Sequence, residues 1–176
     1  MIRVFVVSLC ICAKWDVSFI VNLGGMYDDV LHTDAIVSGV SSCEKWRNIF
    51  LKQDIPLIEH EGSSSIHSLI MQRAIKEKYQ FFGLWGHSPI YLRGTNFRVV
   101  VKMVKLISSF FPIPVNTREL EGSLEDFDHQ IGEILEDNPE LQEYIEKLKK
   151  VRSGELRKKD APKIINIKDF IRQKDV

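Results

Sequence analysis

The residues best suited to chemistry lie in the run Trp85-Gly86-His87-Ser88-Pro89-Ile90-Tyr91, which follows an apolar segment. A histidine at the end of a buried strand could act as a general base, and the neighbouring aromatic rings could stack on a planar ligand. Trp85, His87 and Tyr91 are therefore candidates for a ligand pocket. Neither a cysteine nucleophile nor a Gly-x-Ser-x-Gly elbow accompanies them. A structural histidine, hydrogen-bonded within a tight turn, is the alternative that this pattern favours.

Two glycine-containing segments complete the predicted pocket. Gly24 and Gly25 end an apolar run, where the chain opens into a loop. Gly62 with Ser63 and Ser64 precedes a predicted helix, whose first backbone N–H groups could bind an anion. This second segment lacks the lysine of a phosphate loop and the spacing of a dinucleotide fingerprint. Capping of the helix by the serine hydroxyls is the simpler interpretation.

The sequence predicts neither a metal site nor a cofactor. Glu59, His60 and Glu61 are adjacent, so on a strand their side chains alternate between faces and cannot all reach one metal ion. The three cysteines are Cys10, Cys12 and Cys43, and the C-x-C spacing differs from the usual half of a zinc site. Small buried thiols in a reducing compartment are the expected role of these cysteines.

The charges cancel over the whole chain but are divided unequally along it. The 176 residues hold 24 basic and 24 acidic side chains, which argues against nucleic acid as a partner. Residues 1–118 carry 13 basic and 9 acidic groups, residues 119–146 carry 0 and 11, and residues 147–176 carry 11 and 4. We infer that the acidic and basic C-terminal segments differ in role from the body.

Apolar runs alternate with amphipathic helices over the first two thirds of the chain, which predicts an α/β fold. We expect a mixed or parallel sheet flanked by helices, forming a core domain of residues 1–118. The third expected helix carries Arg98, Lys102 and Lys105 as a basic stripe at helical spacing. The expected strands are 19–23, 35–40, 56–59 and 81–85, the last ending before Gly86, and the expected helices are 43–52, about 66–79 and 96–111.

Residues 119–176 are expected to form a helical extension and tail. Ser123 with Asp126 resembles a capping box, and Asn138-Pro139 gives a second helix start. The apolar stripes of these helices are narrow, so they must pack on the sheet domain or on another chain. The basic stripe and the apolar side chains of the extension are therefore candidates for binding a protein partner. They are Arg98, Lys102, Lys105, Phe127, Ile131, Tyr144 and Phe170.

The first residues superficially resemble a short signal peptide. The apolar run of residues 4–13 is followed by Lys14-Trp15-Asp16 in place of a small-x-small cleavage site. Ten apolar residues are too few to span a bilayer. We therefore expect a cytoplasmic protein that has no membrane partner.

Several segments together resemble one family, the proteasome assembly chaperones of the second type with their archaeal and bacterial relatives. The resemblance runs from about Trp15 to the end, including residues 167–171. The turn motif that ends in Pro89-Ile90-Tyr91, and its spacing to the acidic helices, is its most specific part. The segments that carry it are residues 20–25, 35–41, 61–70, 84–91 and 138–141.

This resemblance implies a fold similar to that of nucleoside phosphorylases and a homo-oligomer. It also implies that the chain binds proteasome subunits or a related complex without catalysis. A protein that binds or processes a nucleoside or phosphate on the same fold is the alternative. The sequence departs from the family at its start, where the family's first strands and helix are missing or replaced by residues 1–14. It also departs after Gly62, where serines replace a threonine and a glycine. Its last residues, ending at Val176, also lack the hydrophobic-tyrosine-any-residue tail of some archaeal members.

Overall fold

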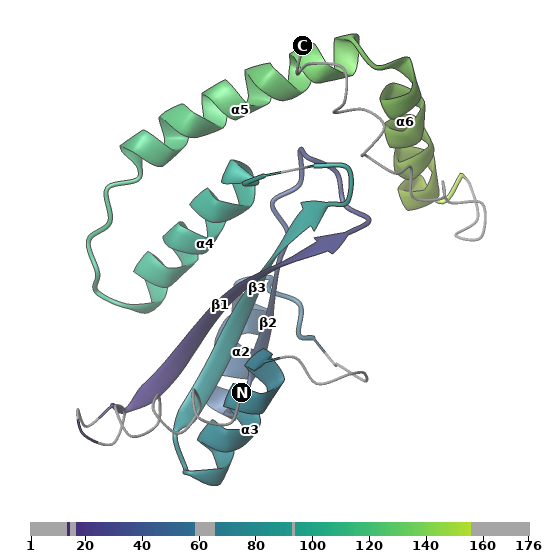
Figure 1. The fold of residues 1–176 in the computed structure, drawn as a ribbon. Coiled ribbons are helices and arrows are strands. Elements are labelled where there is room, and N and C mark those ends of the chain that lie inside the picture. The colour runs from purple at the N-terminus through teal and green to yellow at the C-terminus, as the bar shows by residue number, and fades with distance from the viewer. Residues whose placement is uncertain (1–13, 15–16, 59–65, 93, 156–176) are drawn as a thin grey trace. The chain divides into compact units, whose positions relative to one another are not determined.

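The structure is a computed structural model, and it describes residues 14, 17–58, 66–92 and 94–155. Its strands form one three-stranded sheet in the order β1-β3-β2. β2 pairs antiparallel with β3, with Val37 opposite Gly86 and Ser41 opposite Phe82. β1 and β3 run in the same direction (Figure 1), so the sheet is mixed. The elements are β1 (Phe19–Asp28), β2 (Val37–Ser41), α2 (Glu44–Lys52), α3 (Ile66–Lys76), β3 (Gln80–Pro89), α4 (Phe97–Phe110), α5 (Arg118–Glu136) and α6 (Pro139–Ser153).

The chain divides into two compact units. The first unit is Met1–Gly25 with Val37–Gly86, and the second is Met26–Ile36 with His87–Val176. β1 and β3 each begin in the first unit and end in the second. The predicted boundary at residue 118 follows charge rather than packing, and it stays a prediction.

Aromatic rings form the core of the first unit, where α2 packs on β2. The rings of Trp46 and Phe82 have centroids 4.3 Å apart, and Phe50 meets Phe82 edge-on at 5.6 Å. A Cβ atom at Gly39 of β2 would lie 2.6 Å from the Phe50 ring. The close approach of α2 therefore requires glycine at this position of the strand.

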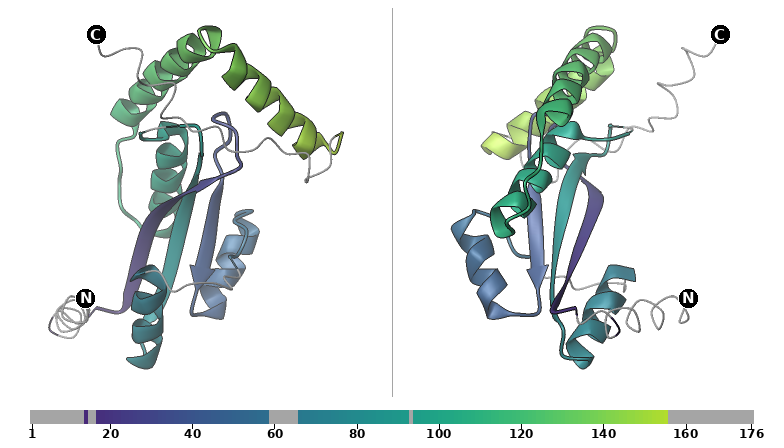
Figure 2. Two further views of the ribbon diagram at one scale, coloured as in Figure 1. Left: turned by 45° about the vertical axis from the view of Figure 1, so that its right-hand side comes forward. Right: turned by 90° about the vertical axis from the view of Figure 1, so that its left-hand side faces the viewer.

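Two apolar clusters form the core of the second unit. One consists of Leu92, Phe127 and Ile131, and the other of Tyr144, Ile145 and Leu148. Tyr91 and Leu135 pack against both clusters. Figure 2 gives two further views of the helices α4, α5 and α6 that belong to this unit. The segment that follows β3 thus lies against both α5 and α6.

The α/β fold with a mixed sheet and accompanying helices is confirmed, but three strands differ from the prediction. β1 continues through Gly24 and Gly25 to Asp28, where the sequence predicted that the chain opens into a loop. β3 continues to Pro89, past the predicted break at Gly86, because its backbone still has partners: His87 N–H donates to Ile36 O at 3.0 Å. The predicted strand 56–59 is reduced to an isolated parallel bridge between Gly39 and Leu57. An apolar run therefore locates a strand, whereas its backbone partners determine where it ends.

The helices begin and end close to the predicted positions, except for α5. Asn96 caps α4 by accepting a hydrogen bond from Val99 N–H at 3.4 Å, and Pro139 lies in the first turn of α6. α5 begins at Arg118, ahead of the predicted start at Ser123, whose hydroxyl donates to Glu119 O at 3.1 Å inside the helix. Within the described part of the chain, no helix has the length and hydropathy needed to cross a membrane.

Candidate functional site

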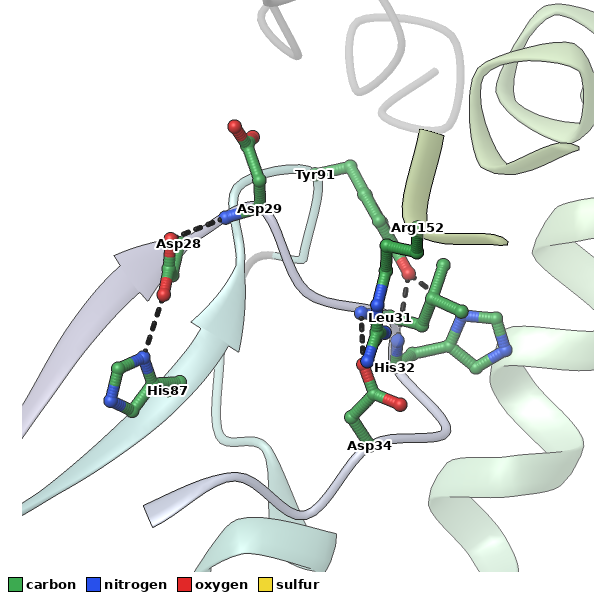
Figure 3. A network of polar contacts seen from close by, with 8 residues as sticks. All are labelled: Asp28, Asp29, Leu31, His32, Asp34, His87, Tyr91 and Arg152. Atoms are coloured by element: carbon green, nitrogen blue, oxygen red, sulfur yellow. Dashed lines mark hydrogen bonds and ion pairs between the residues drawn. The ribbon is translucent and has the colours of Figure 1, made fainter. Parts of the chain in front are cut away.

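The hydroxyl of Tyr91 belongs to a group of polar contacts in the second unit (Figure 3). His32 donates its backbone N–H to this oxygen at 2.8 Å, and His32 Nδ1 lies 2.9 Å from it. The Tyr91 ring meets Tyr144 of α6 edge-on, with centroids 5.8 Å apart. Burial raises the pKa of Tyr91 far above its ordinary value, so the hydroxyl keeps its proton and can donate it.

The loop between β1 and β2 is attached to α6 by charge and by apolar packing. Asp34 accepts the backbone N–H of Leu31 at 2.8 Å and forms an ion pair with Arg152, in the last turn of α6 (Figure 3). The side chain of Leu31 packs against the cluster of Tyr144, Ile145 and Leu148. Residues far apart in the sequence therefore hold one loop on one helix.

His32 has a depressed pKa, chiefly because burial disfavours its charged form. Four charged groups modify this effect. Asp128 and Asp34 act to raise the pKa of His32, whereas Arg98 and Lys149 act to lower it. The neutral imidazole is thus the form that this loop favours.

His87 pairs with Asp28 at the end of β1. Its Nδ1 lies 2.7 Å from Asp28 Oδ2, and the His87 side chain is 12% exposed. Asp28 also accepts the backbone N–H of Asp29 at 2.8 Å. His87 is therefore a largely buried, hydrogen-bonded histidine, but it lies in a strand and not in the tight turn expected from the sequence.

The predicted basic stripe of α4 contacts other parts of its own unit. Arg98 donates to both carboxylate oxygens of Asp128 at 2.6 and 2.5 Å. Lys105 lies 2.8 Å from Glu121, and its hydrogen bond is the main reason why the pKa of that carboxyl is lowered. Lys102 donates to the backbone oxygen of Ala35 at 2.7 Å. The sequence prediction missed the contacts of Arg98 and Lys105 with α5, although opposite charges on consecutive amphipathic helices gave a signal for them.

Of the predicted pocket residues, the structure brings Gly24 and Trp85 together in the first unit. A Cβ atom at Gly24 would lie 2.9 Å from Trp85 Cε3, so the indole ring covers this glycine. Trp85 also meets His67 of α3 edge-on at 4.6 Å, and His67 is hydrogen-bonded to Asn22. At Gly25 the nearest atom to an added Cβ would be Gly86 O, at 3.9 Å. The packing explains Gly24 and Trp85 without a ligand.

The remaining predicted site residues lie in the second unit or outside the described residues. His87 and Tyr91 belong to the second unit, and Gly62, Ser63, Ser64 and Phe170 lie outside the described residues. The partner candidates Phe127, Ile131 and Tyr144 are buried, at 7, 8 and 5% exposure. Their role in partner binding stays a prediction. Among the described residues, no group of three His, Cys, Asp or Glu side chains could hold a metal ion.

The comparisons with known proteins place this geometry in a family. The profile described as the PAC2 family matches residues 6–135. Among solved structures, a PAC2 family protein from Streptomyces avermitilis has a TM-score of 0.66 and 18% identity, and the match covers 74% of this chain and 55% of that protein. No curated protein matches the chain.

Two further solved structures share this fold. A proteasome-assembly chaperone homologue of Mycobacterium tuberculosis has a TM-score of 0.69 and 20% identity, with 81% of this chain and 60% of that protein covered. An archaeal homologue of proteasome-assembly chaperone from Pyrococcus furiosus has a TM-score of 0.57 and 13% identity, with 76 and 60% covered. This chain therefore spans 55 to 60% of the length of these three proteins.

Proposed function

The chain belongs to the PAC2 family, and from this membership we propose that it is a non-enzymatic, chaperone-like assembly factor. Its partners are subunits of the proteasome or of a related complex, which it binds in the cytoplasm as a homo-oligomer. The observation that carries the proposal is the family match, joined to a fold shared with proteins described as proteasome-assembly chaperone homologues.

The helices α5 and α6 support a role in protein binding. Their apolar sides are occupied within the second unit, while most of their carboxylates face solvent. Glu125 and Glu136 are two such exposed side chains on α5. A rigid helix with an acidic outer side can meet a basic surface of a partner subunit, and complementary charge accelerates and orients such encounters.

The absence of catalysis is part of the proposal, and the environment of His87 supports it. Its Nδ1 lies 2.7 Å from Asp28 Oδ2, which holds the ring in place. A histidine held in this way stabilises the ends of β1 and β3.

The test uses the full chain, purified and measured by size-exclusion chromatography with light scattering. It is then offered to recombinant proteasome α subunits of the same organism in a pull-down. We expect a defined oligomer that retains α subunits. A monomer that retains none would contradict the proposal.

Charge variants locate the binding surface in the same assay. The double variant Glu125→Lys and Glu136→Lys reverses two exposed charges of α5 and should weaken retention. Gln72→Lys adds a positive charge to the exposed side of α3 and serves as the control. Equal loss in both variants would mean that α5 is not the surface that recognises the partner.

A further inference from the structure

The Tyr91 hydroxyl has one proton to donate, and its surroundings determine where that proton goes. The oxygen already accepts the backbone N–H of His32 at 2.8 Å. His32 Nδ1, at 2.9 Å, lies within hydrogen-bond distance of the same oxygen. The geometry assigns the Tyr91 proton to this nitrogen, which must then be an acceptor. An imidazole nitrogen accepts a hydrogen bond only while the ring is neutral.

Protonation of His32 removes that acceptor. Nδ1 would then carry a hydrogen that points at an oxygen already accepting another donor, and the Tyr91 proton would lose its acceptor at a part-buried position. A donor that loses its partner where water has only partial access is costly. The neutral ring is therefore the one that fits this arrangement.

We propose that His32 and Tyr91 form a proton-controlled latch, which holds the β1–β2 loop on α6 and releases it when His32 takes up a proton. The inference does not depend on the proposed function, because it concerns contacts inside one unit. The loop reaches α6 through Asp34, which pairs with Arg152, and through Leu31, which packs on the α6 cluster.

Charged groups from every neighbouring element face His32. Asp34 lies on its own loop, Arg98 on α4, Asp128 on α5, and Lys149 on α6. The two carboxylates favour the imidazolium, whereas burial and the two basic groups oppose it. A protonated His32 would also compete with Arg152 for Asp34, and this competition weakens the ion pair that fixes the last turn of α6. Burial, Arg98 and Lys149 together outweigh the two carboxylates, because the pKa of His32 is lowered from its ordinary value of 6.5.

The sign of the pH effect follows from linkage. The closed latch binds a proton on His32 less readily than the open loop does, so acid favours opening. As the pH falls below the ordinary histidine value of 6.5, the equilibrium constant for opening should rise by up to about tenfold per pH unit. This rise ends at the lower pKa of the closed form. Opening uncovers the side chains of Tyr144, Ile145 and Leu148, which the loop helps to cover.

Hydrogen exchange of the intact chain, measured by mass spectrometry at several pH values between about 7.5 and 5.5, tests the latch. Exchange rates are converted into protection factors, which removes the intrinsic effect of pH. We expect the protection of α6 to fall as the pH falls. The variant His32→Asn offers Tyr91 a carbonyl oxygen that stays an acceptor at every pH, and it should abolish this dependence.

The matched controls replace two other histidines. His129 lies on α5 and is 76% exposed, so His129→Asn should leave the pH dependence of α6 unchanged. His87→Asn removes the other histidine of the network and should leave it unchanged as well. The latch is excluded if His32→Asn keeps the wild-type pH dependence, or if α6 protection in the wild type does not change with pH.

A nuclear magnetic resonance titration of the wild type gives a readout that needs no variant to fold. The ring of His32 should titrate below the ordinary histidine value of 6.5, and the amide shifts of α6 should follow the His32 curve. Replacement of Tyr91 by Phe should raise the pKa of His32, because the donor to Nδ1 is lost. A His32 that titrates at or above 6.5 would overturn the proposal.

Discussion

Phe127 provides the sharpest test of the packing between α4 and α5, and we predict that Phe127→Ala destabilises the second unit. The side chain is 7% exposed and belongs to the cluster with Leu92 and Ile131. Its ring meets Phe97 of α4 edge-on, with centroids 6.2 Å apart. Truncation therefore removes contacts to two other segments of the unit at once.

The magnitude follows from these contacts. Burial of a phenylalanine side chain contributes about 1.5 to 3 kcal/mol, and an edge-to-face ring pair adds about 0.5 to 1.5 kcal/mol. The cavity left by the ring adds a further cost, which brings the expected loss in the free energy of unfolding to about 3 to 5 kcal/mol. For a chain of this size, such a loss corresponds to a fall of roughly 6 to 20 °C in the melting temperature.

Two spectroscopic signals separate the two units in a urea titration of this variant. Far-ultraviolet circular dichroism is dominated by the helices α4, α5 and α6, whereas fluorescence of Trp46 and Trp85 reports on the first unit. The dichroism midpoint should move to lower urea. Gln130→Ala changes an exposed position of the same helix and should change the free energy of unfolding by less than about 0.5 kcal/mol. If Phe127→Ala lowered the free energy of unfolding by less than about 1 kcal/mol, this account of the packing would be wrong.

Three further predictions concern the rest of the molecule. Gly39→Ala should cost about 1 to 3 kcal/mol of unfolding free energy, measured by urea titration followed by tryptophan fluorescence, because the added methyl group clashes with Phe50; unchanged stability would mean that α2 lies farther from β2. Arg98→Gln should cost no more than about 1 kcal/mol in the same titration followed by circular dichroism, since its partner Asp128 is 44% exposed and solvent screens the pair. Light scattering at rising salt should show weaker assembly with the proposed partner subunits, because the screening length is about 8 Å at physiological ionic strength and shortens as salt is added. Assembly that strengthens with salt would point to apolar contacts instead.

Hydropathy patterns located the elements of the fold but not all of their limits. α4 and α6 begin where Asn96 and Asn138-Pro139 predict, because local signals decide those positions: Asn96 caps α4 through its side chain, and Pro139 lies in the first turn of α6. β3 extends past Gly86 because Ile36, distant in sequence, supplies an acceptor for its backbone. α5 begins ahead of Ser123 because a longer helix can contact α4. Local signals are visible in the sequence, whereas partners distant in sequence are not.

The polar contacts around Tyr91 could be predicted even less from the sequence, because they too join residues distant in sequence. The sequence marked Tyr91 and His87 as candidates for a ligand pocket, and it assigned no role to the polar residues of the loop before Ala35. Nothing in a single sequence pairs His87 with Asp28 or Arg152 with Asp34, because these contacts join segments that only the folded unit brings together. The polarity of the loop was the one signal that could have indicated its role.

The structure shows that several acidic side chains of the segment after residue 118 are paired with basic side chains. The acidic segment after residue 118 contributes carboxylates to contacts within the unit and within α6, and so does not present its whole charge to a partner. Glu121 and Asp128 pair with α4, and Glu143 and Glu146 pair with lysines of their own helix. A partner that approached these groups would have to compete with the cations already paired with them. Electrostatic recognition should therefore depend on other exposed carboxylates of α5, which is why Glu125 and Glu136 are the positions at which charge reversal separates binding from stability.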